Sequence, residues 1–592
     1  MNKKTKLLEK KNKEEGRETT SLSFLTKFKH LGKILKPKEK AIVYMATFLL
    51  VLATIGGSVK YYISTTQIVA TIGGEYIEGI PVDSAGLPTT INPILSVTRP
   101  IDKLISSVIF STLFTYDSQG QLVNDLVKDY SISDDGKKYT LHLEENALWH
   151  DGQPLTADDV VFTVNLLQDP SYNPIGTKEW NNEKIKVSNP DNKTIIFELS
   201  EPYAPFVNKL TFGILPKHIW TGISSDQFPL TKLNLEPIGS GPFVFDDVKK
   251  NSSGDIISYK LIANVNYHKH QPYLEKLIFK FYPDQKSLET AYAQKEITGF
   301  NFADYEKIPE YQNKNDTSVY AINIPQYFPI LLNRSKSIPL ADEKVRQALQ
   351  YATNRDELIN NIFNGYADKI YSPLIKPFIA EEFNYNEELI KYSPDDAEKL
   401  LEEAGWKKEN DEQFRKKDNE ELKIKLVTTN TKDLIKTVEI LKEQWGKIGI
   451  NVEIIQSDDK LNIRQKYLNP REYESLLLGL EYSGNDPNLF FFWHSTGKKN
   501  PGLNFTLYDN EETDKLLEES KKITDHSKKN EKYIEVGRQL LEDNPAIFLY
   551  SPKYIYVINK KIQGINLQAV VKASDRFNEI THWYAKTKRV RK

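Results

Sequence analysis

An uncharged run of 19 residues, Ala41–Val59, lies near the start of the chain and limits the fold more than any other feature. A helix of this length spans roughly 28 Å at about 1.5 Å per residue, which matches the hydrocarbon core of a bilayer. Lys40 precedes the run, and Tyr61 and Tyr62 follow it as aromatic residues suited to a membrane interface. The run predicts a transmembrane helix at residues 41–59.

The segment before this run indicates its orientation. Residues 1–40 hold 12 Lys and one Arg against five Glu, a net charge of +8. Because basic flanks stay in the cytoplasm, we expect a cytoplasmic tail at 1–40, a tether at 60–70 and an extracytoplasmic part at 71–592. A cleaved signal peptide is one alternative, although its apolar stretch is usually about 7–15 residues, with Ile68-Val69-Ala70 as a candidate cleavage site. A helix buried in a soluble core is the other.

Composition excludes several classes of protein. The 592 residues include 79 Lys and Arg against 81 Asp and Glu, so the basic excess of a nucleic-acid-binding protein is missing. The sequence has no cysteine, which excludes disulfides, thiolate metal ligands, a cysteine nucleophile and a lipid-modified cysteine anchor. The length suggests roughly three to four domains.

Motifs of common enzymes are missing as well. The sequence has no G-x-S-x-G, H-E-x-x-H, P-loop or G-x-G-x-x-G pattern. His268 and His270 have the spacing of a metal pair on one strand face, but no third ligand is near in sequence. His494 is interpreted as a pocket or surface residue. We therefore expect no catalytic residue, no metal and no cofactor.

The clearest structural unit is a β-α-β unit between residues 422 and 455. Apolar residues alternate at 422–426 and 450–454, as in strands, and those from Leu434 to Ile448 repeat at helical spacing. The next apolar run, Ser475–Leu480, is predicted as a further strand. Because ligands bind beyond the carboxyl ends of strands in open α/β sheets, the loop Glu481–Pro487 is a candidate ligand site.

Local signals predict shorter elements. Alternation predicts strands at Lys138–Leu143 and Thr194–Leu199. Residues 134–136, Asp-Asp-Gly, are typical of a hairpin turn before the first of these strands. Thr156 with Asp159 three residues later predicts the start of a helix.

A longer motif carries a family resemblance. The sequence NALWHDGQPLTADDVVFT at Asn146–Thr163 closely resembles the signature of the family 5 extracellular solute-binding proteins, the peptide- and nickel-binding components of ABC importers. Further blocks follow in that family's order, so the resemblance covers roughly residues 73–580. These blocks are Leu113–Gly136, Ile238–Phe243, Val345–Gly365, Tyr392–Trp406, Trp445–Val452, Asp486-Pro487 with Phe490, and Asp543–Tyr550.

The resemblance implies an α/β fold of the periplasmic binding protein type (type II, the large peptide-binding class). Two lobes would close on a ligand about a hinge, with an extra lobe attached. Residues 71–592 would form the solute-binding domain. Lobe I would use about 71–105, 209–325 and 541–592, the extra lobe about 106–208, and lobe III about 326–540.

The resemblance also implies where the ligand binds. In peptide binders of this family an aspartate three residues before the Asp-Pro pair captures the peptide α-amine, and this chain has Ser483 there. A neutral serine cannot pair with an ammonium as a carboxylate does. Either Glu481 therefore takes over that role or the protein does not recognise the amine. The expected ligand-binding residues are Glu481, Tyr482, Ser483, Asn485, Asp486 and Trp493.

The expected function is that of a membrane-anchored, monomeric solute-binding protein. It would capture a peptide or another small solute by clamp closure and deliver it to the permease of an ABC importer, without binding nucleic acid. The alternatives are an anchored sensor or chaperone with the same fold, which the long basic tail favours, and a binder of a non-peptide solute.

Overall fold

The computed structural model describes residues 36–82, 86–96, 99–172, 180, 185–302, 304–375, 386–409, 412–457, 460–482, 484, 486–523 and 525–592. The chain divides into two units. One contains the residues up to Ala70 together with Thr587–Lys592, and the other is Thr71–Lys586. The predicted cytoplasmic tail, apart from residues 36–40, lies outside the described residues.

The first unit consists of one long helix and a two-stranded ribbon. Helix α3 (Pro37–Thr65) has no buried residue and is the one helix of the described chain that is long and apolar enough to cross a membrane. Strand β1 (Thr66–Thr71) follows it directly and pairs with β24 (Lys586–Arg591). The segment predicted as a tether therefore continues the helix to Thr65 and then forms a strand.

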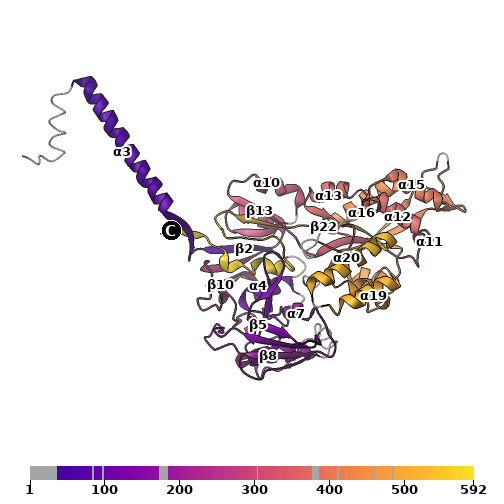
Figure 1. Ribbon diagram of the computed structural model, residues 1–592, viewed down its shortest axis with the longest axis horizontal. Coiled ribbons are helices and arrows are strands. Elements are labelled where there is room, and N and C mark those ends of the chain that lie inside the picture. Colours follow the sequence, from indigo (N-terminus) through magenta and orange to yellow (C-terminus); the bar gives the residue numbers. More distant parts are fainter. Residues whose placement is uncertain are drawn as a thin grey trace, which may run out of the picture. The chain divides into compact units, whose positions relative to one another are not determined.

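Lobe I of the second unit is built on a seven-stranded mixed sheet (Figure 1). Its central strand β2 runs parallel to β11 and β12, whereas β23 pairs antiparallel with β12 and β13. The order is β13 (Thr317–Ile322), β23 (Tyr554–Asn559), β12 (Gly299–Phe302), β2 (Glu75–Pro81), β11 (Lys276–Tyr282), β10 (Ile256–Ala263) and β9 (Phe243–Lys250). Helices α4 (Pro100–Ile109), α9 (Gln285–Ala293) and α10 (Ile308–Gln312) also belong to it.

Lobe III has a second seven-stranded sheet, which contains the predicted β-α-β unit. Strand β18 is parallel to β19, as the β-α-β pattern predicts, and it is also parallel to β20. The order is β15 (Ala367–Lys369), β22 (Ala546–Pro552), β14 (Gln326–Leu332), β20 (Ser475–Leu477), β18 (Lys423–Thr429) and β19 (Asn451–Ser457), with β21 (Leu480–Glu481) beside β14. Its main helices are α12 (Glu343–Tyr351), α13 (Arg355–Phe363), α15 (Pro394–Glu403), α16 (Lys432–Lys447), α19 (Glu511–Ser520) and α20 (His526–Asp543).

The extra lobe contains a four-stranded antiparallel sheet of β5 (Val127–Ile132), β6 (Lys138–Leu143), β8 (Thr194–Glu198) and β7 (Lys186–Ser188). The predicted hairpin joins β5 to β6, with Gly136 at φ 67° in its turn. Helix α5 (Ala157–Gln168) begins with the predicted capping box, in which the Thr156 backbone N–H donates to Asp159 at 2.8 Å. These local predictions are confirmed.

Two short crossings join lobes I and III. The chain passes between the sheets after β13, through residues 323–325, and returns at Lys553 between β22 and β23. The ammonium of Lys553 contacts both Asn323 and Asp368, so it links the two crossings to lobe III. The predicted boundary at residue 541 lies inside α20, and β22 still belongs to the sheet of lobe III, so the return crossing lies about a dozen residues later.

Candidate ligand-binding site

The candidate loop starts beside the first of these crossings. Glu481 is the last residue of β21 and pairs with Gln326 of β14, and the Tyr482 backbone N–H donates to Pro325 O at 2.9 Å. The loop is therefore attached at the position where a rotation between the lobes would take place. Ser483 and Asn485 lie outside the described residues.

Glu481 presents its carboxylate at the boundary between the lobes. Its side chain is exposed to solvent, yet the protein around it raises the pKa of the carboxyl group above the ordinary 4.5. Lys103 of α4 and Lys572, both in lobe I, act in the opposite direction. Glu481 of lobe III thus carries its carboxylate near two cations of lobe I.

The segment that carries Lys572 is held by a buried ion pair that the sequence did not reveal. Lys572 comes just before a 3-10 turn, Ala573–Phe577, that packs against α4. In this turn Arg576 donates from Nη2 to Glu78 Oε1 at 2.7 Å, and Tyr76 and Tyr556 each donate to Glu78 Oε2 at 2.6 Å. Because a buried charge needs such partners, the pair fixes the segment that carries Lys572.

The same loop contacts the extra lobe. Asn488 Nδ2 donates to Tyr203 Oη at 3.4 Å. Gly484 has φ +100°, and a Cβ there would lie 3.0 Å from Tyr116 Oη and 3.7 Å from Asn208 Cβ. Glycine is required because the backbone adopts a left-handed conformation in a narrow gap. The loop thus contacts all three lobes.

Asp486 is buried inside lobe III. It is 7% exposed, forms an ion pair with Lys529 of α20, and accepts a hydrogen bond from Tyr533 Oη at 3.0 Å. It also accepts the backbone N–H of Asn488 at 2.8 Å. Its partners on α20 make it a support for the loop.

Tyr482 and Trp493 belong to an aromatic core beneath the loop. The Tyr482 ring lies 5.6 Å from that of Tyr327, and the Trp493 ring lies 5.7 Å from that of Phe548. Burial raises the pKa of Tyr327, and the neighbouring Trp493 indole lowers it by less. Neither Tyr327 Oη nor Trp493 Nε1 reaches hydrogen-bond geometry with a described residue. The two side chains therefore belong to the packed interior of lobe III.

The histidines do not form a metal site within the described residues. His268 is buried, and its Nε2 lies 3.3 Å from Asp125 Oδ1, so it joins lobe I to the start of the extra lobe. His270 packs against the ring of Tyr273 at 4.7 Å. His494 stacks on Phe490 at 4.2 Å and bonds to Thr496. These three histidines thus contact neighbouring side chains within the fold.

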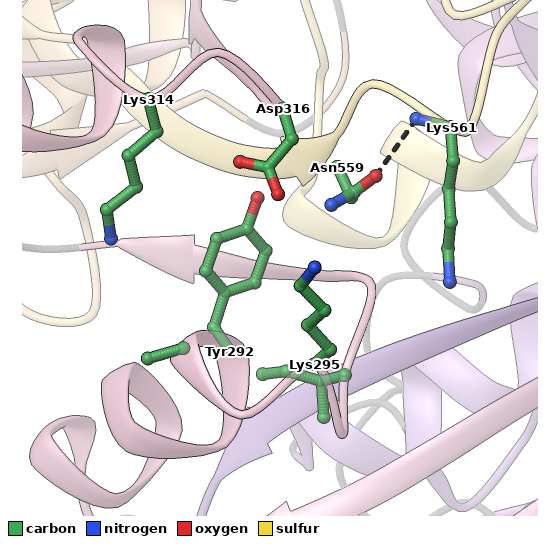
Figure 2. A pocket seen from close by; sticks show the side chains of 8 residues that line it. Tyr292, Lys295, Lys314, Asp316, Asn559 and Lys561 are labelled. Carbon is green, nitrogen blue, oxygen red and sulfur yellow. Dashed lines mark hydrogen bonds between the residues drawn. The ribbon is translucent and has the colours of Figure 1, made fainter.

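A separate pocket of about 440 Å³ lies wholly within lobe I. Figure 2 shows Tyr292 and Asp316 close together at its centre, with Lys295, Lys314 and Lys561 around them. The Lys561 backbone N–H donates to Asn559 Oδ1 at 3.0 Å, the dashed line in the figure. None of the residues predicted from the sequence lines this pocket, so it is distinct from the site predicted at the Glu481 loop.

Known proteins with the same architecture are similar to this chain over most of their length. The oligopeptide-binding protein AppA of Bacillus subtilis is 28% identical over 567 residues, which cover 93% of this chain and all of AppA. The structure of AppA with a nonapeptide has a TM-score of 0.64 at 26% identity and covers 87% of this chain and 99% of AppA. NikZ of Campylobacter jejuni, solved with Ni(L-His), has a TM-score of 0.67 at 25% identity, with coverages of 86% and 99%.

The family itself is shown by a profile. The profile described as bacterial extracellular solute-binding proteins, family 5, middle, matches residues 121–502, which is more than half of the chain. This confirms the resemblance carried by the motif at Asn146–Thr163 and the type of fold that it implies. The chain belongs to the family 5 bacterial extracellular solute-binding proteins, and its binding part is extracytoplasmic.

Proposed function

We propose that this protein captures a peptide-like solute outside the cytoplasm and delivers it to the permease of an ABC importer, acting as a membrane-anchored monomer without catalysis. The observation that carries the proposal is the position of the Glu481 loop, beside a crossing between two lobes and in contact with the third. The similarity to AppA, whose structure holds a nonapeptide, supports a peptide as the ligand.

The proposed mechanism is hinge closure about the two crossings. Short crossings let two lobes rotate as rigid bodies, because few backbone angles need to change. In the described chain, the backbone passes between the two seven-stranded sheets only at residues 323–325 and at Lys553. Closing the lobes brings Glu481 toward Lys103 and Lys572 and removes a ligand between them from water.

The charges of the cleft suit a peptide with free ends. Glu481 offers a carboxylate to an α-amine, and Lys103 and Lys572 offer ammonium groups to a carboxylate. We propose that Glu481 takes the role of the amine-binding aspartate, because this chain has Ser483 at the position of that aspartate. Tyr482, Asn485, Asp486 and Trp493 shape or support the same site.

Glu481→Gln is expected to weaken a free-amine peptide by about 1.5–3 kcal/mol, roughly 10- to 150-fold, because one charge-assisted hydrogen bond is lost. Isothermal titration calorimetry with a peptide library measures this. Glu443→Gln, an exposed glutamate on α16, is the matched control and should bind as the wild type does.

The affinity for a free-amine peptide should also depend on pH. The ammonium binds the ionised carboxylate, and the pKa of Glu481 lies above 4.5 before binding. Affinity should therefore be full above that pKa and decrease as the pH falls through it, whereas the affinity of Glu481→Gln should not change with pH in this range.

Equal affinity of the wild type for free and N-acetylated peptides would exclude amine recognition. If no peptide gives heat while the folded protein binds another solute, the peptide assignment is wrong.

The anchor is proposed from α3, which is apolar, has no buried residue and is followed directly by a paired strand. An uncleaved helix with its basic flank inside keeps an N-terminal tag in the cytoplasm. Protease added to intact spheroplasts should therefore leave such a tag uncut. Release of a soluble protein that starts near Thr71 would instead mean that the helix is a cleaved signal.

A further inference from the structure

The ribbon of β1 and β24 carries a dense group of positive charges at the end of α3. Residues 586–592 contain Lys586, Lys588, Arg589, Arg591 and Lys592 and no acidic residue, in a chain whose net charge is −2. Residues 60–72 add Lys60 and again no acidic residue. Segments more than 500 residues apart in sequence thus form one basic surface, which is exposed along β24 except at Val590.

The ribbon is fixed to the helix end by specific contacts. The Lys592 backbone N–H donates to Thr65 O at 3.0 Å, and Arg589 Nη1 donates to Thr66 Oγ1 at 2.9 Å. The Arg589 guanidinium also lies 5.7 Å from the centre of the Tyr62 ring. The cations are therefore held at a defined distance from the apolar part of α3.

That distance matches the outer boundary of a membrane. Thr66 follows Val59 by seven residues, which is about 10 Å along a helix. The headgroup layer on each side of a bilayer is about 5–8 Å thick. With Val59 at the end of the hydrocarbon core, the ribbon starts where the headgroups end, within reach of long Lys and Arg side chains.

Both faces of the ribbon carry cations. Successive side chains of a strand point to opposite faces, so Lys586 and Lys588 lie on one face and Arg589 and Arg591 on the other. The ribbon therefore meets headgroups with cations whichever face is turned to the bilayer.

We infer that the β1–β24 ribbon binds the anionic phospholipid headgroups of the membrane that α3 crosses, and so lies down on the outer surface. The inference rests on the proposed anchor. Each basic side chain near an anionic surface shifts the equilibrium by about fivefold, so four of them strongly favour the docked ribbon. An acidic protein surface is the competing partner.

The test uses a single thiol, because the natural sequence has no cysteine. Thr587→Cys places a fluorescent label at the start of β24, which is exposed and about 17 Å along the strand from Lys592. The labelled full chain is inserted into nanodiscs of phosphatidylcholine, with or without about one third phosphatidylglycerol. A spin label on the lipid headgroups then quenches the probe only when the ribbon lies on the surface.

Phosphatidylglycerol is expected to increase this quenching by at least about twofold, and added salt should remove the increase through screening. Lys588→Gln, Arg589→Gln, Arg591→Gln and Lys592→Gln together should abolish it. The matched control removes the same charge from exposed lysines of lobe III and should keep it: Lys407→Gln, Lys408→Gln, Lys442→Gln and Lys447→Gln.

Equal quenching in both kinds of disc would overturn the inference, and so would full quenching in the four-residue ribbon variant. A response to the purified permease in phosphatidylcholine discs, without a response to phosphatidylglycerol, would assign the surface to a protein instead. If the chain does not enter the discs at all, the proposed anchor is wrong. That result differs from an anchored chain whose ribbon does not bind the headgroups.

Discussion

Asp486→Asn is expected to destabilise lobe III by about 3–5 kcal/mol, because it leaves the ammonium of Lys529 buried without its counter-charge. Lys529 is 4% exposed and Asp486 is 7% exposed, so water cannot replace the lost partner. Chemical denaturation followed by the fluorescence of lobe III tryptophans, Trp493 among them, measures the change. Ligand affinity should also decrease, because the side chain that accepts the Asn488 backbone N–H is no longer held in place by the ion pair with Lys529.

The double variant Asp486→Asn with Lys529→Met separates support from ligand contact. It removes both charges, so most of the stability should return. If Asp486 only supports the loop, affinity should recover with stability. If stability recovers while affinity stays low, Asp486 contacts the ligand directly, as the family resemblance first implied.

The sequence predicted the position of the loop better than the orientation of its side chains. Strand periodicity and the β-α-β rule are local, so they located the segment after β20. Whether Asp486 or Trp493 faces solvent depends on α20 and on β22, which arrive some 40 to 60 residues later in the chain. A sequence pattern near residue 486 contains no information about Lys529.

The buried ion pair that holds the Lys572 segment was missed for a similar reason. Arg576 and Glu78 are nearly 500 residues apart, and neither lies in a motif that requires an ion pair. The one available signal was a charged residue within an apolar strand, since Glu78 stands between Ile77 and Gly79 in β2. A charge at such a position predicts a buried partner but does not identify it.

The β1–β24 ribbon shows the same limit of prediction from local sequence. Residues 60–70 contain few turn or helix-stop signals, and a tether was the simplest interpretation. Strand β1 exists because β24 supplies its hydrogen bonds, and an isolated strand of this length would not be stable. Pairing across the whole chain is therefore what turned the predicted linker into structure.

Gly484→Cys combined with Asn208→Cys is expected to lock the lobes closed through a disulfide. A Cβ at Gly484 would lie 3.7 Å from Asn208 Cβ, within the 3.5–4.5 Å range of disulfides. The natural sequence has no cysteine, so a faster-moving band on a non-reducing gel reports this bond alone. A ligand that favours closure should accelerate bond formation, because it increases the closed population.

Once oxidised, the protein should release bound ligand about 5- to 150-fold more slowly than when reduced, the range of typical coupling energies between binding and closure. Gly484→Cys alone carries the same strain at φ +100° and controls for it. Gly484→Cys with Lys186→Cys uses the same two lobes but a residue that does not face Gly484, and it should not cross-link. If ligand leaves the oxidised and reduced proteins at the same rate, contact between the Gly484 loop and the extra lobe does not gate the site, and hinge closure is not the mechanism of capture.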